Sequence, residues 1–114
     1  VRPIDWQTIS DSVNRTGRML VLDTGNLTGS ISGEIVARIT SDCWEELKYS
    51  PQRLAMPDFP EGTSFALTAN YHVRAEHIVS KICQMFGRVF DTQSLVAQRQ
   101  YPHDVPGDWF SGPF

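Results

Sequence analysis

The sequence predicts an α/β fold with a mostly parallel sheet, because residues 17–39 have the pattern of a strand, a turn and a helix in succession. The run Met19–Leu22 is continuously apolar, as expected for a strand covered on both faces. A turn rich in glycine and serine follows, which suits a sharp change of chain direction and a helix cap. Apolar residues at helical spacing then begin after Glu34. This order is the repeating unit of a parallel α/β sheet.

The segment before this unit, within residues 1–16, predicts a surface helix that packs on the sheet. Asp5 is a good N-cap residue, and Gly17 is a natural stop because glycine adopts the left-handed C-cap conformation without strain. The apolar residues between them form one stripe: Trp6, Ile9 and Val13. No residue pattern in this helix indicates chemistry.

The helix after the glycine-rich turn is expected to run from about Glu34 to Leu47. Glu34 lies in its first turn, where the helix dipole favours an anion. Its apolar residues recur at every fourth position, with two more beside them: Ile35, Ile39, Cys43 and Leu47, then Val36 and Trp44. The segment Tyr49–Pro51 breaks this helix, and Gln52–Met56 predicts a second strand.

The connections in the second half of the chain are less regular. Pro57–Gly62 predicts a rigid loop rich in turns. The pattern of residues 63–73 is ambiguous, and a loop that packs against the protein is one interpretation of its large side chains: Phe65, Leu67 and Tyr71. The pattern of residues 94–98 does not decide between a helix and a loop.

The clearest helix of the second half is Arg74–Phe86, and Gly87 occupies its C-cap position. Its apolar side is made of Ile78, Val79, Ile82, Cys83, Met85 and Phe86. The three residues that follow, Arg88–Phe90, are compatible with a short strand. This helix is therefore expected to pack on the sheet as well.

The chain divides into a domain, residues 1–100, and a C-terminal tail, residues 101–114. The tail has three prolines and two glycines, which exclude a helix or a central strand. It also carries too much aromatic surface for a solvated tail, so we expect it to lie along this domain or a partner. Its candidate interface residues are Tyr101, Trp109, Phe110 and Phe114. A loose terminus is the alternative.

Composition excludes several classes of function. The 114 residues carry a formal net charge of −3 and no basic run, which argues against nucleic acid as a partner. No apolar segment approaches membrane-spanning length and no secretory leader opens the sequence, so we expect a cytoplasmic protein without a membrane partner. Cys43 and Cys83 both fall on apolar faces of predicted helices, and we expect buried reduced thiols rather than a disulfide.

Catalytic and metal-binding patterns are weak throughout the sequence. The histidines and nearby carboxylates fit no metal-ligand spacing: His72, His77 and His103 with Asp58, Glu76 and Asp104. No G-x-S-x-G nucleophile turn is present, and glycines at every fourth residue are not the dinucleotide fingerprint G-x-G-x-x-G. We therefore predict no catalytic, cofactor-binding or metal-binding residue.

An anion site in the glycine-rich turn stays open as a hypothesis. Free backbone N–H groups at a helix N-terminus can hold an anion, and serine hydroxyls can assist. The candidate residues are Gly29, Ser30, Ser32 and Gly33. The structural alternative, a turn needed only to connect strand and helix, is favoured.

Beyond these patterns, the order and spacing of several segments resemble the C-terminal domain of transketolase-like enzymes. The resemblance is strongest to the beta subunit of the E1 component of 2-oxoacid dehydrogenases. It covers residues 2–87 and is carried by Arg2-Pro3-Ile4-Asp5, Thr16-Gly17-Arg18, Leu20-Val21-Leu22-Asp23, Thr28-Gly29, Gly33-Glu34-Ile35, Ala37-Arg38-Ile39, Pro57-Asp58 and Arg74-Ala75-Glu76-His77-Ile78-Val79.

This resemblance implies a three-layer α/β/α domain that carries no catalytic residue. In such enzymes thiamine diphosphate and its magnesium ion lie between two other domains, and the family's glycine-aspartate-glycine motif for them is absent here. Gly107-Asp108-Trp109 does not replace that motif. The C-terminal domain instead contributes to dimer contacts, and in the dehydrogenases it helps to dock the acyltransferase core. The implied partners are therefore the other domains or subunits of a parent enzyme.

Two departures from the family pattern are visible. Thr24 follows Asp23 where the family usually has a second acidic residue, and the glycine pair before the helix is reduced to Gly29-Ser30. The family domain also begins with a strand, a helix and a strand before the segment that matches Arg2–Asp5, so this chain matches it only in part. A sheet without those strands exposes an edge, which predicts self-association. The alternative function is a free-standing α/β module that binds a small anion at Gly25–Gly33.

Overall fold

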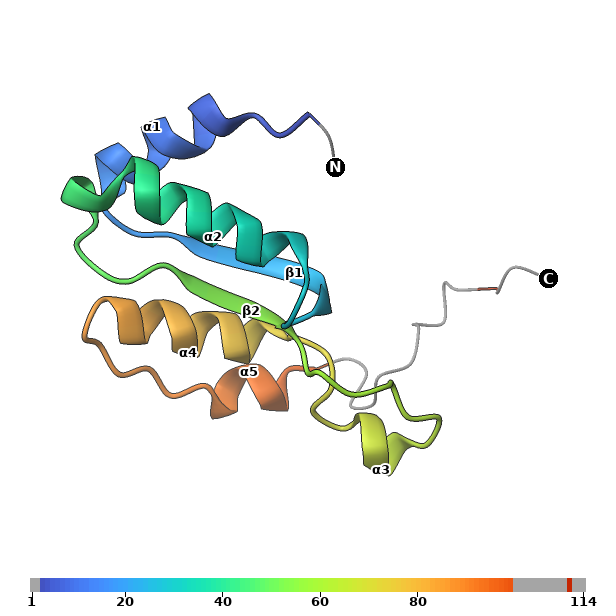
Figure 1. Ribbon diagram of the computed structural model, residues 1–114. Coiled ribbons are helices and arrows are strands. Elements are labelled where there is room, and N and C mark those ends of the chain that lie inside the picture. The colour runs from blue at the N-terminus through green and yellow to red at the C-terminus, as the bar shows by residue number, and fades with distance from the viewer. Residues whose placement is uncertain (1–2, 100–110, 112–114) are drawn as a thin grey trace.

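The computed structural model describes residues 3–99 and residue 111 of the chain (Figure 1). Helices and strands alternate over residues 6–56, and three helices follow in the part that the structure describes. In chain order the elements are α1 (Trp6–Thr16), β1 (Leu20–Asn26), α2 (Ile31–Asp42), the 3₁₀ turn η1 (Trp44–Glu46), β2 (Gln52–Met56), α3 (Phe65–Thr68), α4 (Ala75–Met85) and α5 (Gln93–Ala97). The tail residues singled out from the sequence, Tyr101, Trp109, Phe110 and Phe114, lie outside the described residues.

The two strands pair in parallel, which confirms the prediction of a parallel α/β unit. Leu20 is opposite Gln52 and Leu22 is opposite Leu54, and the register shifts before Asn26 meets Met56. Figure 1 shows α1 and α2 on one side of the strand pair and α4 and α5 on the other. This layering agrees with the α/β/α class inferred from the sequence.

The two ends of α1 follow the local rules expected of its sequence. The Thr8 N–H group donates to Asp5 Oδ1 at 3.0 Å, which caps the first turn. Gly17 ends the helix with φ 70°, and its N–H group donates to the carbonyl of Val13. A Cβ atom at Gly17 would lie 2.7 Å from Lys48 Cγ, so glycine is needed here for both conformation and space.

The hydrophobic core lies where α1 and α2 meet β1. Val13, Ile39 and Cys43 are buried, and Ile39 is completely inaccessible. Partly buried side chains surround this cluster: Ile9, Met19, Ile35 and Leu47. The apolar stripes predicted for the first two helices are thus the surfaces that form the core.

The covering of β1 differs from the expectation of a strand buried on both faces. Leu22, at the middle of the strand, is 52% exposed. Within the described residues β1 pairs only with β2, and its alternate residues Leu22, Thr24 and Asn26 are exposed. A continuously apolar strand needs a cover on each face, and in the described part of the chain one of those faces stays open.

Four details of the sequence-based elements were wrong. The helix after the glycine-rich turn begins at Ile31 instead of Glu34 and ends at Asp42 instead of Leu47. It ends early because the chain tightens into η1, and Trp44, expected beside the apolar stripe, is 70% exposed there. Arg88–Phe90 forms no strand: Gly87 turns the chain with φ 63°, and Val89 and Phe90 are exposed. Both cysteines are free, yet Cys83 is only partly buried.

The fourth wrong detail is the apolar side of α4, which is only partly buried. Met85 is buried, whereas Ile82 is 41% and Phe86 54% exposed. Two regions whose secondary structure the sequence left undecided contain helices: residues 63–73 include α3, and residues 94–98 fall largely within α5. No helix in the described part of the chain is both long and apolar enough to cross a membrane.

Candidate functional site at the carboxyl ends of the strands

Asp23, at the centre of β1, organises the glycine-rich turn. Its Oδ1 atom accepts a hydrogen bond from the Gly25 N–H group at 2.8 Å, and its Oδ2 atom accepts one from the Ser32 N–H group at 3.1 Å. The Gly25 N–H group above all, and then the Ser32 N–H group and the Ser30 and Ser32 hydroxyls, lower the pKa of Asp23 below that of an ordinary aspartate. Asp23 is therefore a carboxylate at neutral pH.

The four residues proposed for an anion site are brought together in this turn. Ser30 is the N-cap of α2 but makes no capping bond with its side chain; its Oγ atom lies 2.6 Å from Ser32 Oγ. The Ser32 N–H group is bound to Asp23, and the Gly33 N–H group donates to the carbonyl of Ser30 at 3.1 Å. Gly29 supplies the left-handed turn with φ 79°. The Asp23 carboxylate thus lies where an external anion would bind, which favours the structural alternative.

A second carboxylate, Asp58, joins the two loops that leave the sheet. It accepts hydrogen bonds from the Thr28 N–H group at 2.7 Å and the Thr28 hydroxyl at 2.6 Å. The Thr28 hydroxyl, followed by its N–H group, lowers the pKa of Asp58. Beside this contact, Asn26 Nδ2 donates to the Pro57 carbonyl at 3.0 Å and Arg53 donates to the Leu27 carbonyl at 2.9 Å.

Sequence reasoning missed this latch between the loops. Half of the signal was present, because Asp58 follows the predicted strand Gln52–Met56 by two residues. Thr28 has the same position after β1, but β1 ends at Asn26, four residues later than the predicted run Met19–Leu22. The carboxyl ends of neighbouring parallel strands meet at one edge of a sheet, which is also where α/β proteins place their binding sites. Here the polar groups at that edge bind one another, and their contacts lock the loops together.

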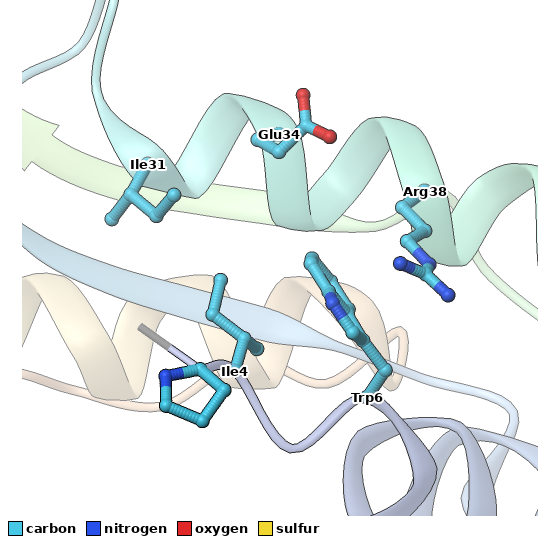
Figure 2. Close-up of a pocket in the computed structure, with 6 residues that line it drawn as sticks. Ile4, Trp6, Ile31, Glu34 and Arg38 are labelled. Carbon is cyan, nitrogen blue, oxygen red and sulfur yellow. The ribbon is translucent and has the colours of Figure 1, made fainter. Parts of the chain in front are cut away.

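A separate hollow of about 370 Å³ lies between the start of α1 and the first turns of α2 (Figure 2). Its walls are formed by Pro3, Ile4, Trp6, Ile31, Glu34 and Arg38. The Arg38 guanidinium lies 4.4 Å from the centre of the Trp6 ring and its Nε atom is 3.1 Å from Asp42 Oδ2. The Glu34 carboxylate points away from Trp6. These contacts fasten α1 to α2, and the lining offers no paired acid and base.

The histidines considered as metal ligands have other contacts. His72 Nε2 lies 3.0 Å from Glu61 Oε1, and His77 Nδ1 accepts a hydrogen bond from the Arg74 N–H group at 3.1 Å. The described residues contain no group of three histidine, cysteine or acidic side chains that could hold a metal ion. His103 and Asp104 lie outside the described residues.

The fold and this edge of the sheet define a class of protein: a parallel α/β domain whose polar residues at the carboxyl ends of the strands secure its own loops. A family model described as transketolase, C-terminal domain, matches residues 1–78. The chain therefore belongs to the transketolase C-terminal domain family.

The chain is similar to beta subunits of two dehydrogenases, pyruvate dehydrogenase and 2-oxoisovalerate dehydrogenase. The chain is 41% identical over 54 residues to the pyruvate dehydrogenase E1 component subunit beta of Mycoplasma pneumoniae, covering 47% of this chain and 16% of the relative. It is 35% identical over 60 residues to the 2-oxoisovalerate dehydrogenase subunit beta of Bacillus subtilis, covering 53% and 18%. It is 26% identical over 85 residues to the pyruvate dehydrogenase E1 component subunit beta of Mesostigma viride, covering 75% and 26%. The chain thus spans 16–26% of the length of these relatives.

Proposed function

We propose that this chain is a non-catalytic part of the beta subunit of a thiamine-diphosphate-dependent 2-oxoacid dehydrogenase. In this role it supports subunit assembly and partner docking, while thiamine diphosphate and magnesium bind to other parts of the parent enzyme. Family membership over residues 1–78 carries the proposal, together with the named relatives. The hydrogen bonds of Asp23 and Asp58 support the non-catalytic role, because both carboxylates hold the loops of this domain.

The open side of β1 is the surface that we propose for assembly. A strand edge without a partner is a template for pairing with another strand. β1 is seven residues long and contains no lysine, arginine or proline that would discourage such pairing. A parallel strand pair also needs apolar cover, and exposed Leu22 marks the face where that cover is missing in the described residues. The remaining domains of the parent subunit or a second copy of this chain would supply it.

The C-terminal tail, residues 101–114, is our second proposed docking segment. Clustered aromatic side chains anchor many protein interfaces, and the tail carries four of them: Tyr101, Trp109, Phe110 and Phe114. The acyltransferase core of the parent complex is the partner that the family resemblance suggests. We also propose a cytoplasmic location, with which two free thiols are compatible.

Hydrodynamic measurements on the 114-residue chain test the assembly role. Sedimentation at two protein concentrations is expected to give a species larger than the monomer. Leu22→Arg should shift it towards the monomer, because the charge would have to be buried in the new interface. Val89→Arg is the matched control, since Val89 is fully exposed in the loop after α4. A well-folded monomer of the unaltered chain at both concentrations would contradict self-association.

Calorimetry separates this proposal from the anion-binding alternative. Titration of the chain with thiamine diphosphate and magnesium should release no binding heat. Titration with inorganic phosphate should give no saturable signal either, because Asp23 already binds the N–H group of Ser32. Saturable phosphate binding that is lost in Ser32→Ala would favour the free-standing module. Saturable thiamine diphosphate binding would contradict a non-catalytic part.

A further inference from the structure

The helix α5 has little packing of its own. It is five residues long, none of its residues is buried, and α4 is the element that it packs against. A helix this short is not stable alone in water, because nucleation costs more than one turn of hydrogen bonds returns. Some other interaction must therefore hold it against the domain.

An ion pair beside α5 meets this requirement. Glu76, in the first turn of α4, is 7% exposed, and its carboxylate contacts the guanidinium of Arg99, which follows α5 by two residues. The Arg99 side chain is 20% exposed. A carboxylate this deeply buried is costly unless a cation compensates it, so the pair is stable only while Arg99 stays in place.

Arg99 is not the only arginine at the beginning of α4. Burial of the guanidinium, and then the charge of Arg99, lower the pKa of Arg74. Arg74 is the residue just before α4, and Arg99 contacts Glu76 in the first turn of α4. Two arginines therefore lie at the beginning of this helix, which carries the buried Glu76.

We propose that Glu76 and Arg99 form a clasp that holds α5 against the first turns of α4. Figure 1 shows α5 lying beside α4 on the side of the sheet away from α1 and α2. The inference follows from these contacts and does not depend on the proposed assembly role.

Hydrogen exchange on the 114-residue chain tests the clasp through Glu76→Gln. The N–H groups of Leu95, Val96 and Gln98, which bond to carbonyls within α5 and its N-cap, should exchange about tenfold faster or more, because opening of α5 no longer breaks the pair. Tryptic cleavage after Arg99 should accelerate relative to cleavage after Arg88. Lys81→Gln is the matched control on α4, since Lys81 contacts Gln84 at the surface.

Unchanged exchange of α5 in Glu76→Gln would overturn the clasp. Arg99→Ala is the second variant, because it removes the partner without leaving an extra arginine charge near Arg74. It should accelerate exchange in α5 while the α2 amides around Ile39 keep their protection. If both variants lose their secondary structure altogether, the pair supports the whole domain and the clasp proposal is wrong.

Discussion

Asp23 is the single residue on which the glycine-rich turn depends. It serves two N–H donors at once, so Asp23→Ala leaves the Gly25 and Ser32 groups without their acceptor. We expect a loss of about 0.5–2 kcal/mol in the free energy of unfolding, the usual range for removing a side chain that caps a helix N-terminus. Urea unfolding followed by circular dichroism measures it.

The control for this change is Asp42→Asn at the other end of α2. Asp42 makes an exposed ion pair with Arg38, and its removal should cost less than about 0.5 kcal/mol. Asp23→Asn should fall between the two, because its amide oxygen still accepts one of the two hydrogen bonds. Equal unfolding midpoints for Asp23→Ala and Asp42→Asn would show that the turn does not need its carboxylate.

Three aspartates give the stability of the protein a pH dependence of known sign. The Thr8 N–H group lowers the pKa of Asp5, as the Gly25 N–H group does for Asp23 and the Thr28 hydroxyl for Asp58. In the unfolded chain an aspartate has a pKa of about 3.9. The folded state therefore binds protons at these three carboxylates less tightly than the unfolded chain does. Their contribution to the free energy of unfolding is fully present above about pH 4, and it is lost as the pH falls through their lowered pKa values in the folded state.

The measurement is the urea midpoint at pH 7, 5 and 3. It should change little between the first two values and fall at the third, and Asp58→Asn should make that fall shallower. An unaltered slope in Asp58→Asn would mean that the Thr28 latch does not form in solution.

Among the elements, the junction between α1 and β1 leaves no room for an added side chain. Gly17 combines a positive φ with close neighbours, since a Cβ atom would meet Lys48 Cγ at 2.7 Å and the carbonyl oxygen of Glu46 at 3.0 Å. Gly17→Ala should cost about 1–2 kcal/mol from left-handed strain, and more from displacing Lys48. Gly29→Ala and Gly87→Ala share the positive φ but have no neighbour within 4 Å, so they isolate the conformational part.

Thermal unfolding of the three alanine variants checks this order. Gly17→Ala should have the lowest midpoint of the set. A midpoint for Gly17→Ala equal to that of Gly87→Ala would mean that Lys48 moves aside without cost.

Local patterns in the sequence predicted the elements well, and neighbours in space account for the errors. The caps Asp5 and Gly17 and the stripe through Val13 depend on residues a few positions apart, which the sequence displays directly. The end of α2 at Asp42 and the exposure of Leu22 depend on what packs against them. The spacing of apolar residues along one segment does not show which other segments pack against it.

The same distinction explains the candidate site. The glycines and serines of the turn were identified, but the occupant of its N–H groups was not, because Asp23 lies nine residues before Ser32 and reaches it only through the fold. The Thr28–Asp58 latch spans 30 residues and requires the parallel pairing of both strands. Glu76 had been weighed as a metal ligand, and its contact with Arg99 could be recognised only once α5 was placed beside α4.

At the scale of the whole molecule, one arginine connects the two sides of the strand pair. Arg18 lies just before β1, yet its Nε atom donates to the carbonyl of Met85 at 3.1 Å and its guanidinium lies 4.4 Å from the centre of the Phe86 ring. Met85 ends α4, so Arg18 satisfies a carbonyl that has no partner within its own helix. The side that carries the core is thereby attached to the side that carries the clasp.

Arg18→Ala should therefore release α4 more than it disturbs α1 and α2. A hydrogen bond and a cation–π contact together contribute about 1–2 kcal/mol at a partly buried position. Hydrogen exchange should show faster opening of α4 with the amides around Ile39 unchanged, and Arg18→Lys should recover part of the effect, since lysine keeps the charge without the planar stack. Arg15→Ala, an exposed arginine in the last turn of α1, controls for the loss of charge. Equal acceleration of α4 exchange in Arg15→Ala and Arg18→Ala would mean that the charge, and not the contact with Met85 and Phe86, holds the two sides together.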